Sequence, residues 1–102
     1  MKKDKNFIIS IDQGTTSSRA ILFNLKGQPV YTSQKEFTQY FPKSGWVEHD
    51  PEEIWSSTKK TLNDVIKKSK KIKGKILTIG ITNQRETTVL WNKKTGKAVY
   101  NA

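Results

Sequence analysis

The stretch that decides the fold is FIISIDQGTTSSRAILFN, residues 7–24. It contains two runs rich in β-forming residues, 7–12 and 19–24, and the polar stretch 13–18 separates them. Apolar runs of this length joined by a polar turn are typical of a hairpin. We therefore predict two antiparallel strands that are apolar on both faces and buried.

A third strand is predicted after this hairpin. Gly27 ends a short polar turn, and residues 29–37 then alternate weakly between apolar and polar side chains. Pro29 stands at the first position of this run, where a strand tolerates proline. We expect this strand near an edge of the sheet.

A helix is predicted to begin at Pro51, with Asp50 as its N-cap and Glu53 completing a capping box. One apolar stripe recurs at three- to four-residue spacing along it: Ile54, Thr58, Leu62, Val65 and Ile66. The lysine run 67–75 overlaps the last turns, where the helix dipole favours cations, and Gly74 marks the end. We interpret the lysines as a solvated face.

Two further elements follow the helix. Residues 76–82 predict a strand buried on both sides, and the order strand, helix, strand predicts a crossover that returns parallel to the sheet. Residues 87–91 and 97–101, joined by a turn over 92–96, predict a terminal hairpin. The expected fold class is therefore α/β.

Composition narrows the possible partners. The chain has 102 residues, with 19 basic and 9 acidic side chains and a formal net charge of +10. This charge favours an anionic partner such as nucleic acid, a membrane surface or a phosphate metabolite, but only Arg19 and Arg85 carry the guanidinium fork suited to bidentate recognition. The absence of cysteine excludes disulfides and thiolate metal sites. No apolar run is long enough for a secretion signal or a membrane span, so a cytoplasmic protein is expected.

The polar turn of the first hairpin is a candidate phosphate-binding loop. Gly14 lets the backbone approach an anion, and three hydroxyl side chains follow it: Thr15, Thr16 and Ser17. Asp12 could hold a hydrated magnesium ion, and Arg19 could neutralise phosphate charge. A hydroxyl-rich turn that satisfies its own hydrogen bonds explains the same pattern equally well.

Three motifs resemble a known family. They are DQGTTSSR at 12–19, GWVEHDP at 45–51 and GITNQRETT at 80–88. In this order they are similar to the N-terminal signatures of the FGGY carbohydrate kinases, and in particular of the members that phosphorylate glycerol. The resemblance runs from residue 7 to residue 102. It implies the ribonuclease H/actin-like ATPase fold, whose opening strand, turn and strand form the first phosphate loop.

The resemblance also assigns roles to residues. It implies that the ATP phosphates are lined by Thr15, Thr16, Ser17 and Arg19. Asp12 would lie near Mg²⁺, and Arg85 and Glu86 would contact glycerol, because vicinal hydroxyls need both a donor fork and a carboxylate acceptor. Without the resemblance, an adjacent Arg and Glu after a strand are more typical of a solvated loop.

The family's catalytic base lies beyond the motifs of this chain, so we expect no catalytic residue among residues 1–102 and no turnover by them alone. We interpret residues 1–102 as the N-terminal part of the first domain of a longer kinase. The longer protein would convert glycerol and ATP to sn-glycerol 3-phosphate, with no nucleic-acid or membrane partner, and a homo-oligomer is compatible with it. Another FGGY sugar kinase and a basic nucleic-acid-binding module remain alternatives.

Two other residue types have structural interpretations. His49 is the single histidine, and no metal-ligand or triad spacing surrounds it, so we expect a polar contact just before the helix N-cap. Trp46, Trp55 and Trp91 are expected to pack against other residues and not to stack on bases.

Overall fold

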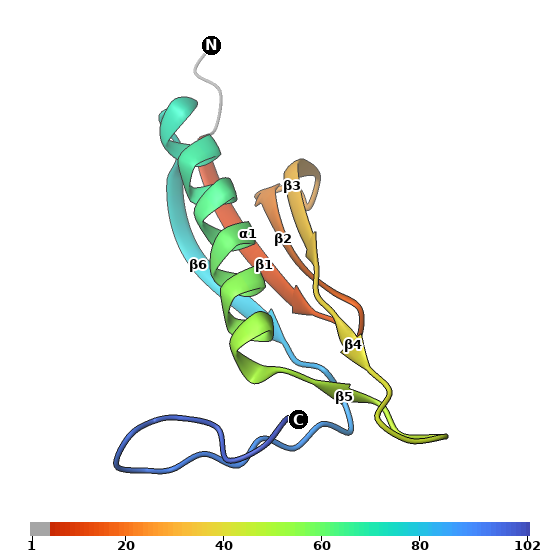
Figure 1. Cartoon of the computed structure of the whole chain (residues 1–102). Helices are drawn as coiled ribbons and strands as arrows, with labels where there is room; N and C mark the ends of the chain where they lie inside the picture. Colours follow the sequence, from red (N-terminus) through yellow and green to blue (C-terminus); the bar gives the residue numbers. More distant parts are fainter. Residues whose placement is uncertain (1–4) are drawn as a thin grey trace.

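The computed structural model describes residues 5–102; residues 1–4 of the proposed domain lie outside the described part. Seven elements follow one another along the chain: β1 (Asn6–Gln13), β2 (Ser17–Asn24), β3 (Pro29–Glu36), β4 (Gln39–Tyr40), β5 (Glu48–His49), α1 (Pro51–Lys71) and β6 (Lys75–Thr82). Four strands form one sheet in the order β3-β2-β1-β6, and α1 lies along one face of it (Figure 1). The fold is mixed α/β, as predicted.

The sheet topology confirms the predicted hairpin and crossover. β1 pairs antiparallel with β2, β3 takes an edge beside β2, and β6 returns parallel to β1. The polar stretch between the first two strands is shorter than predicted, because β1 continues to Gln13 and β2 already begins at Ser17. Only residues 14–16 remain as the turn.

The core lies between α1 and one face of the sheet. It consists of alternate residues of β1 and β2 together with one helix residue: Phe7, Ile9, Ile11, Ala20, Leu22 and Val65. The prediction that the hairpin is buried on both faces is wrong for the described residues. Ile8 and Ile21 on the opposite face stay half-buried, because α1 covers only one side of the sheet (Figure 1).

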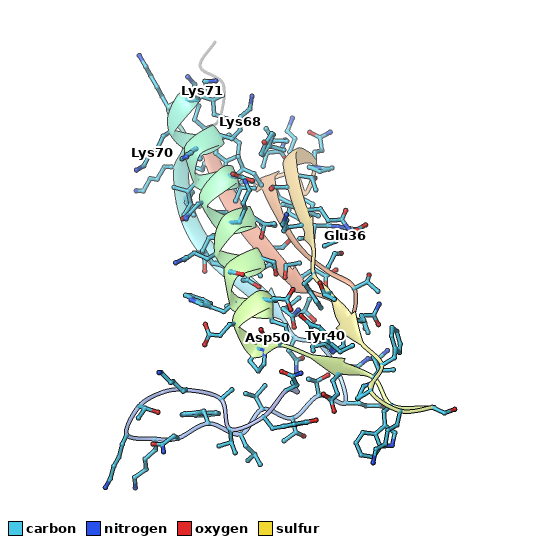
Figure 2. The ribbon with its side chains drawn as sticks, viewed as in Figure 1. Glu36, Tyr40, Asp50, Lys68, Lys70 and Lys71 are labelled. Carbon is cyan, nitrogen blue, oxygen red and sulfur yellow. The ribbon has the colours of Figure 1, made fainter. Side chains whose placement is uncertain are left out.

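The start of α1 confirms the predicted cap and revises the capping box. The Asp50 carboxylate accepts a hydrogen bond from the Glu52 backbone N–H at 2.9 Å, and Pro51 is the first helical residue. The Glu53 carboxylate instead accepts from the Tyr40 hydroxyl at 2.6 Å, which ties the helix start to β4. Figure 2 shows Asp50 and Tyr40 at one end of α1 and the lysines of its last turn at the other.

The buried face of α1 is offset from the predicted stripe. Its most buried residues are Ser57, Thr61, Val65 and Ser69, whereas the larger apolar residues flank them. Small hydroxyl residues let the helix approach β2 closely, and Ser18 of β2 lies 2.8 Å from the Ser57 hydroxyl, oxygen to oxygen. The Thr61 hydroxyl donates to the backbone carbonyl three residues earlier at 3.0 Å, so its burial leaves this hydroxyl hydrogen-bonded.

The predicted burial of β6 is wrong for the described part of the chain. Leu77, Ile79 and Ile81 are 48, 42 and 74 % exposed. The strand pairs with β1 along one edge only, and among residues 5–102 no strand is paired with its other edge. Within residues 5–102, the apolar sequence of β6 therefore does not indicate that its side chains are buried.

The terminal segment forms a turn without regular strands. The Asn92 N–H donates to the Lys97 carbonyl at 2.8 Å, and Trp91 and Ala98 form an isolated bridge. The predicted hairpin is thus reduced to its turn and one bridge. The tryptophans Trp46, Trp55 and Trp91 are all at least half exposed, and the Lys43 and Lys59 ammonium groups lie over the rings of the first two. Within residues 5–102, no helix is both long and apolar enough to span a bilayer.

Candidate functional site

A cleft of about 500 Å³ opens where β1 and β6 end. Because the two strands are parallel, their carboxyl ends meet at the same edge of the sheet, with Asp12 opposite Thr82. Two segments line the cleft: residues 12–15, at the end of β1 and in the following turn, and residues 82–86, which follow β6. Open α/β sheets bind ligands at this kind of position.

The turn from β1 to β2 is tight and is held from both sides. The Gly14 N–H donates to the Ser17 carbonyl at 2.9 Å, and a Cβ on Gly14 would lie only 3.1 Å from that same oxygen. The Thr16 carbonyl accepts from the Phe37 N–H at 3.1 Å. The threonines of the turn, Thr15 and Thr16, are exposed to solvent. The loop therefore presents hydroxyls from a constrained backbone.

Asp12, Ser17 and Arg19 share the sheet face that points away from α1. Their neighbours Ile11, Ser18 and Ala20 alternate with them and are buried toward the helix. Asp12 stands directly opposite Arg19 in the β1–β2 register. The Ser17 hydroxyl accepts a hydrogen bond from the Gln34 side-chain amide at 2.8 Å.

The segment after β6 contains the second predicted pair, Arg85 and Glu86. Both side chains are exposed and line the cleft. Glu86 has φ = +56°, in the left-handed region that costs an L-residue free energy. The Arg85 carbonyl accepts from the Thr87 hydroxyl at 3.1 Å. Backbone strain of this kind is concentrated at functional sites, so the turn is a candidate binding element.

The structure brings together four of the seven predicted site residues: Asp12, Thr15, Arg85 and Glu86 line one cleft. The other three, Thr16, Ser17 and Arg19, belong to the same turn and strand but lie outside the lining of this cleft. The Asp12 carboxylate and the Thr15 hydroxyl thus lie on one wall of the cleft. The Arg85 guanidinium and the Glu86 carboxylate lie on the other.

Sequence reasoning missed Thr82, Asn83 and Gln84, which line the same cleft. The parallel pairing of β1 with β6 was the available signal, because it places whatever follows β6 beside whatever follows β1. Gln84 is buried, and its side-chain nitrogen lies 3.1 Å from Nδ1 of His49. This contact confirms the prediction that His49 makes a polar contact just before the N-cap.

Residues 7–102 match the N-terminal domain of the FGGY family of carbohydrate kinases. A glycerol kinase of Oceanobacillus iheyensis is 60 % identical over 98 residues, which are 96 % of this chain and 20 % of that protein. A glycerol kinase of Aeromonas hydrophila is 54 % identical over 102 residues, covering all of this chain and 20 % of that protein. The chain spans about a fifth of the length of the curated relatives it matches.

Solved structures give the same fold. The crystal structure of Plasmodium falciparum glycerol kinase with ADP has a TM-score of 0.86 and 38 % identity, covering 99 % of this chain and 20 % of that one. A ligand-bound xylulose kinase from Lactobacillus acidophilus has a TM-score of 0.83 and 26 % identity, covering 94 % of this chain and 19 % of that one. The sheet and helix described above are therefore part of the ribonuclease H/actin-like ATPase fold, as expected from the sequence.

Proposed function

The chain belongs to the FGGY family of carbohydrate kinases, and from that premise we propose that its protein transfers the γ-phosphoryl group of ATP to glycerol, giving sn-glycerol 3-phosphate. Residues 1–102 would form the N-terminal part of the first domain. The observation that carries the proposal is the cleft in which Arg85 and Glu86 face Asp12 and Thr15. The glycerol kinases that are 54–60 % identical to this chain support glycerol as the substrate.

The turn between β1 and β2 would receive the phosphates of ATP. Its tight backbone, held by the Gly14–Ser17 hydrogen bond, and its exposed hydroxyls suit an anion. Thr15, Thr16 and Ser17 would donate hydrogen bonds, and Arg19 would neutralise charge from the first residues of β2. The Plasmodium falciparum relative, whose structure contains ADP, supports a nucleotide at this fold.

Asp12 suits a magnesium ion that accompanies the nucleotide. Its carboxylate is exposed at the carboxyl end of β1 and lines the cleft. Among residues 5–102, no cluster of three or more His, Cys, Asp or Glu side chains forms a cage for a metal. Mg²⁺ needs no cage, since one or two carboxylates, waters and substrate phosphates usually complete its shell. When bound, the ion would offset phosphate charge.

Arg85 and Glu86 would hold glycerol on the opposite wall. The guanidinium donates in a fixed fork and the carboxylate accepts, so the pair can bind two neighbouring hydroxyls at once. Their backbone is constrained by the left-handed conformation of Glu86. Because transfer to a hydroxyl depends mainly on positioning, a fixed glycerol beside the phosphate loop is the main contribution of this segment.

A chimaera tests the proposed substrate. Residues 7–102 would replace the matching segment of the Oceanobacillus iheyensis glycerol kinase, and ADP formation would be measured with glycerol, xylulose and gluconate in turn. We expect activity with glycerol of the same order as the parent enzyme and little with the two sugar substrates. Activity that prefers xylulose or gluconate would indicate another FGGY sugar kinase and refute glycerol as the substrate.

Two variants of the chimaera separate the two walls of the cleft. Arg85→Ala should raise KM for glycerol by about 10-fold or more, because it removes a charged hydrogen-bond donor. Arg19→Ala should mainly impair the use of ATP. Lys70→Ala removes a cation at the far end of α1 (Figure 2) and is the matched control. Unchanged kinetics in both arginine variants would refute the site assignment.

A further inference from the structure

The His49 side chain contacts one wall of the cleft, at the segment that follows β6. It ends β5, is 4 % exposed, and its Nδ1 lies 3.1 Å from the side-chain nitrogen of Gln84. Gln84 is itself 8 % exposed and immediately precedes Arg85 and Glu86. A contact between His49 and Gln84 therefore fixes the start of the turn that would bind glycerol.

The same imidazole contacts an anchor of the phosphate loop. The Phe37 ring lies edge-on to His49, with ring centroids 5.4 Å apart and an interplanar angle of 80°. Phe37 is buried, and its backbone N–H donates to the Thr16 carbonyl at 3.1 Å. One continuous series of contacts thus runs from Thr16 through Phe37 and His49 to Gln84.

The backbone of His49 is held on two sides. Its N–H donates to the Ala102 carbonyl at 2.8 Å, and its carbonyl accepts from the Ala102 N–H at 2.7 Å. It also pairs with Gln39 in the short β4–β5 ladder. Because the backbone cannot shift freely, the ring has a defined position between the phosphate loop and the Arg85–Glu86 turn.

The His49–Gln84 contact is polar and buried. Nδ1 of His49 and the side-chain nitrogen of Gln84 lie 3.1 Å apart, and the two residues are 4 % and 8 % exposed. Removing one partner would leave the other buried without it, which costs free energy. The contact therefore holds Gln84 in one place.

We propose that His49 is a positioning residue that, through Gln84 and Phe37, sets the placement of the Arg85–Glu86 turn relative to the phosphate loop. The inference rests on the proposed function, since it concerns how glycerol is aligned with ATP. His49 itself does not line the cleft. It acts on glycerol only through Gln84 and the turn.

Kinetics of the chimaera test this role. His49→Phe keeps an aromatic ring against Phe37 but removes the polar contact to Gln84. A displaced Arg85–Glu86 turn would lose charged hydrogen bonds to glycerol, so we expect KM for glycerol to rise about 10- to 100-fold while KM for ATP stays within about 2-fold. His49→Asn, which can place an amide near the position of Nδ1, should restore most of the loss. An equal change in both KM values, or no change, would overturn the proposal.

A second variant and a matched control guard against misfolding. Gln84→Met removes the same hydrogen bond from the other side while leaving His49 in place, and it should reproduce the selective rise in KM for glycerol. Gln28→Met removes a side-chain hydrogen bond of 2.9 Å to Asn24 in the remote β2–β3 turn, and it should change neither KM. If Gln84→Met behaves like Gln28→Met, the positioning role is refuted even if His49→Phe does not fold.

Backbone dynamics separate this proposal from the proposed function. In the 102-residue chain, His49→Phe should lower the NMR backbone order parameters of residues 83–86 but not those of residues 24–28. Lower order parameters at 83–86 support the positioning role even if the chimaera does not phosphorylate glycerol, a result that would refute only the proposed function. Unchanged order parameters at 83–86 would overturn the positioning role even in an active chimaera.

Discussion

Replacing Glu86 by glycine should stabilise the chain and damage its function at the same time. Glu86 has φ = +56°, and a left-handed backbone costs an L-residue roughly 1–2 kcal/mol. Glycine removes this cost but gives the unfolded chain more freedom, which offsets about 0.4–1 kcal/mol. We therefore expect a net gain of about 0.5–1 kcal/mol in the free energy of unfolding.

Lys73 provides the matched control. It has φ = +55°, is exposed, and lies just beyond the C-cap of α1, away from the cleft. Lys73→Gly should therefore give the same stabilisation as Glu86→Gly. For a domain of this size, 1 kcal/mol corresponds to roughly 4–8 °C, so both variants should raise Tm by about 2–8 °C when the unfolding of α1 is followed by far-ultraviolet circular dichroism.

The two variants should differ in catalysis. In the chimaera, Glu86→Gly removes a carboxylate acceptor from glycerol, and a hydrogen bond to a charged group is worth about 1.5–3 kcal/mol, so kcat/KM for glycerol should fall about 10- to 150-fold. Lys73→Gly should leave it unchanged. If Glu86→Gly lowers Tm while Lys73→Gly raises it, the strain argument fails. If both keep full activity, Glu86 has no role in binding glycerol.

Three further outcomes follow from the structure. Gly74→Ala should destabilise the chain by about 1–3 kcal/mol, because its Cβ would lie 2.5 Å from Cδ2 of the buried Phe7 ring; Gly80→Ala, with no atom within 4 Å, is the control in a urea titration. The Ser33 hydroxyl donates a hydrogen bond to the Asp64 carboxylate and holds the pKa of that carboxyl below its ordinary value. The bond therefore stabilises the folded chain at pH values above the pKa of Asp64 in the unfolded chain. This stabilisation is lost as pH falls through the pKa of Asp64 in the folded chain. Ser33→Ala should raise that pKa in a carboxyl NMR titration and lower stability at neutral pH; an unchanged pKa would contradict this. Finally, the 102-residue chain alone should show no glycerol-dependent ATP consumption in a coupled assay.

The first three strands could be predicted as elements from their local sequence pattern, although only one face of β1 and β2 is buried. Phe7, Ile9 and Ile11 face the helix, and the Asp50 N-cap is a local signal that needs no tertiary information. The buried face of α1 could not be predicted in this way. Thr61 is buried but polar, and hydropathy does not reveal that its hydroxyl bonds to a carbonyl of its own helix.

The site was predictable as two separate halves but not as one cleft. The loop after β1 and the Arg85–Glu86 pair each have a recognisable sequence, yet only the parallel pairing of β1 with β6 brings them together. The same pairing places Gln84 at the cleft, but it does not predict what the Gln84 side chain contacts. Its importance depends on a contact with His49, 35 positions earlier, that no local pattern encodes.

The lysines at the end of α1 lie too far from the cleft to identify its ligand. The last turn of α1 holds Lys68, Lys70 and Lys71, at the end opposite Asp50 (Figure 2). A helix of 21 residues is about 30 Å long, whereas charges in physiological salt are screened over about 8 Å. These lysines therefore exert little force at the carboxyl ends of β1 and β6. An anion in the cleft would depend on the hydroxyls, the backbone of a tight turn and the nearby arginines.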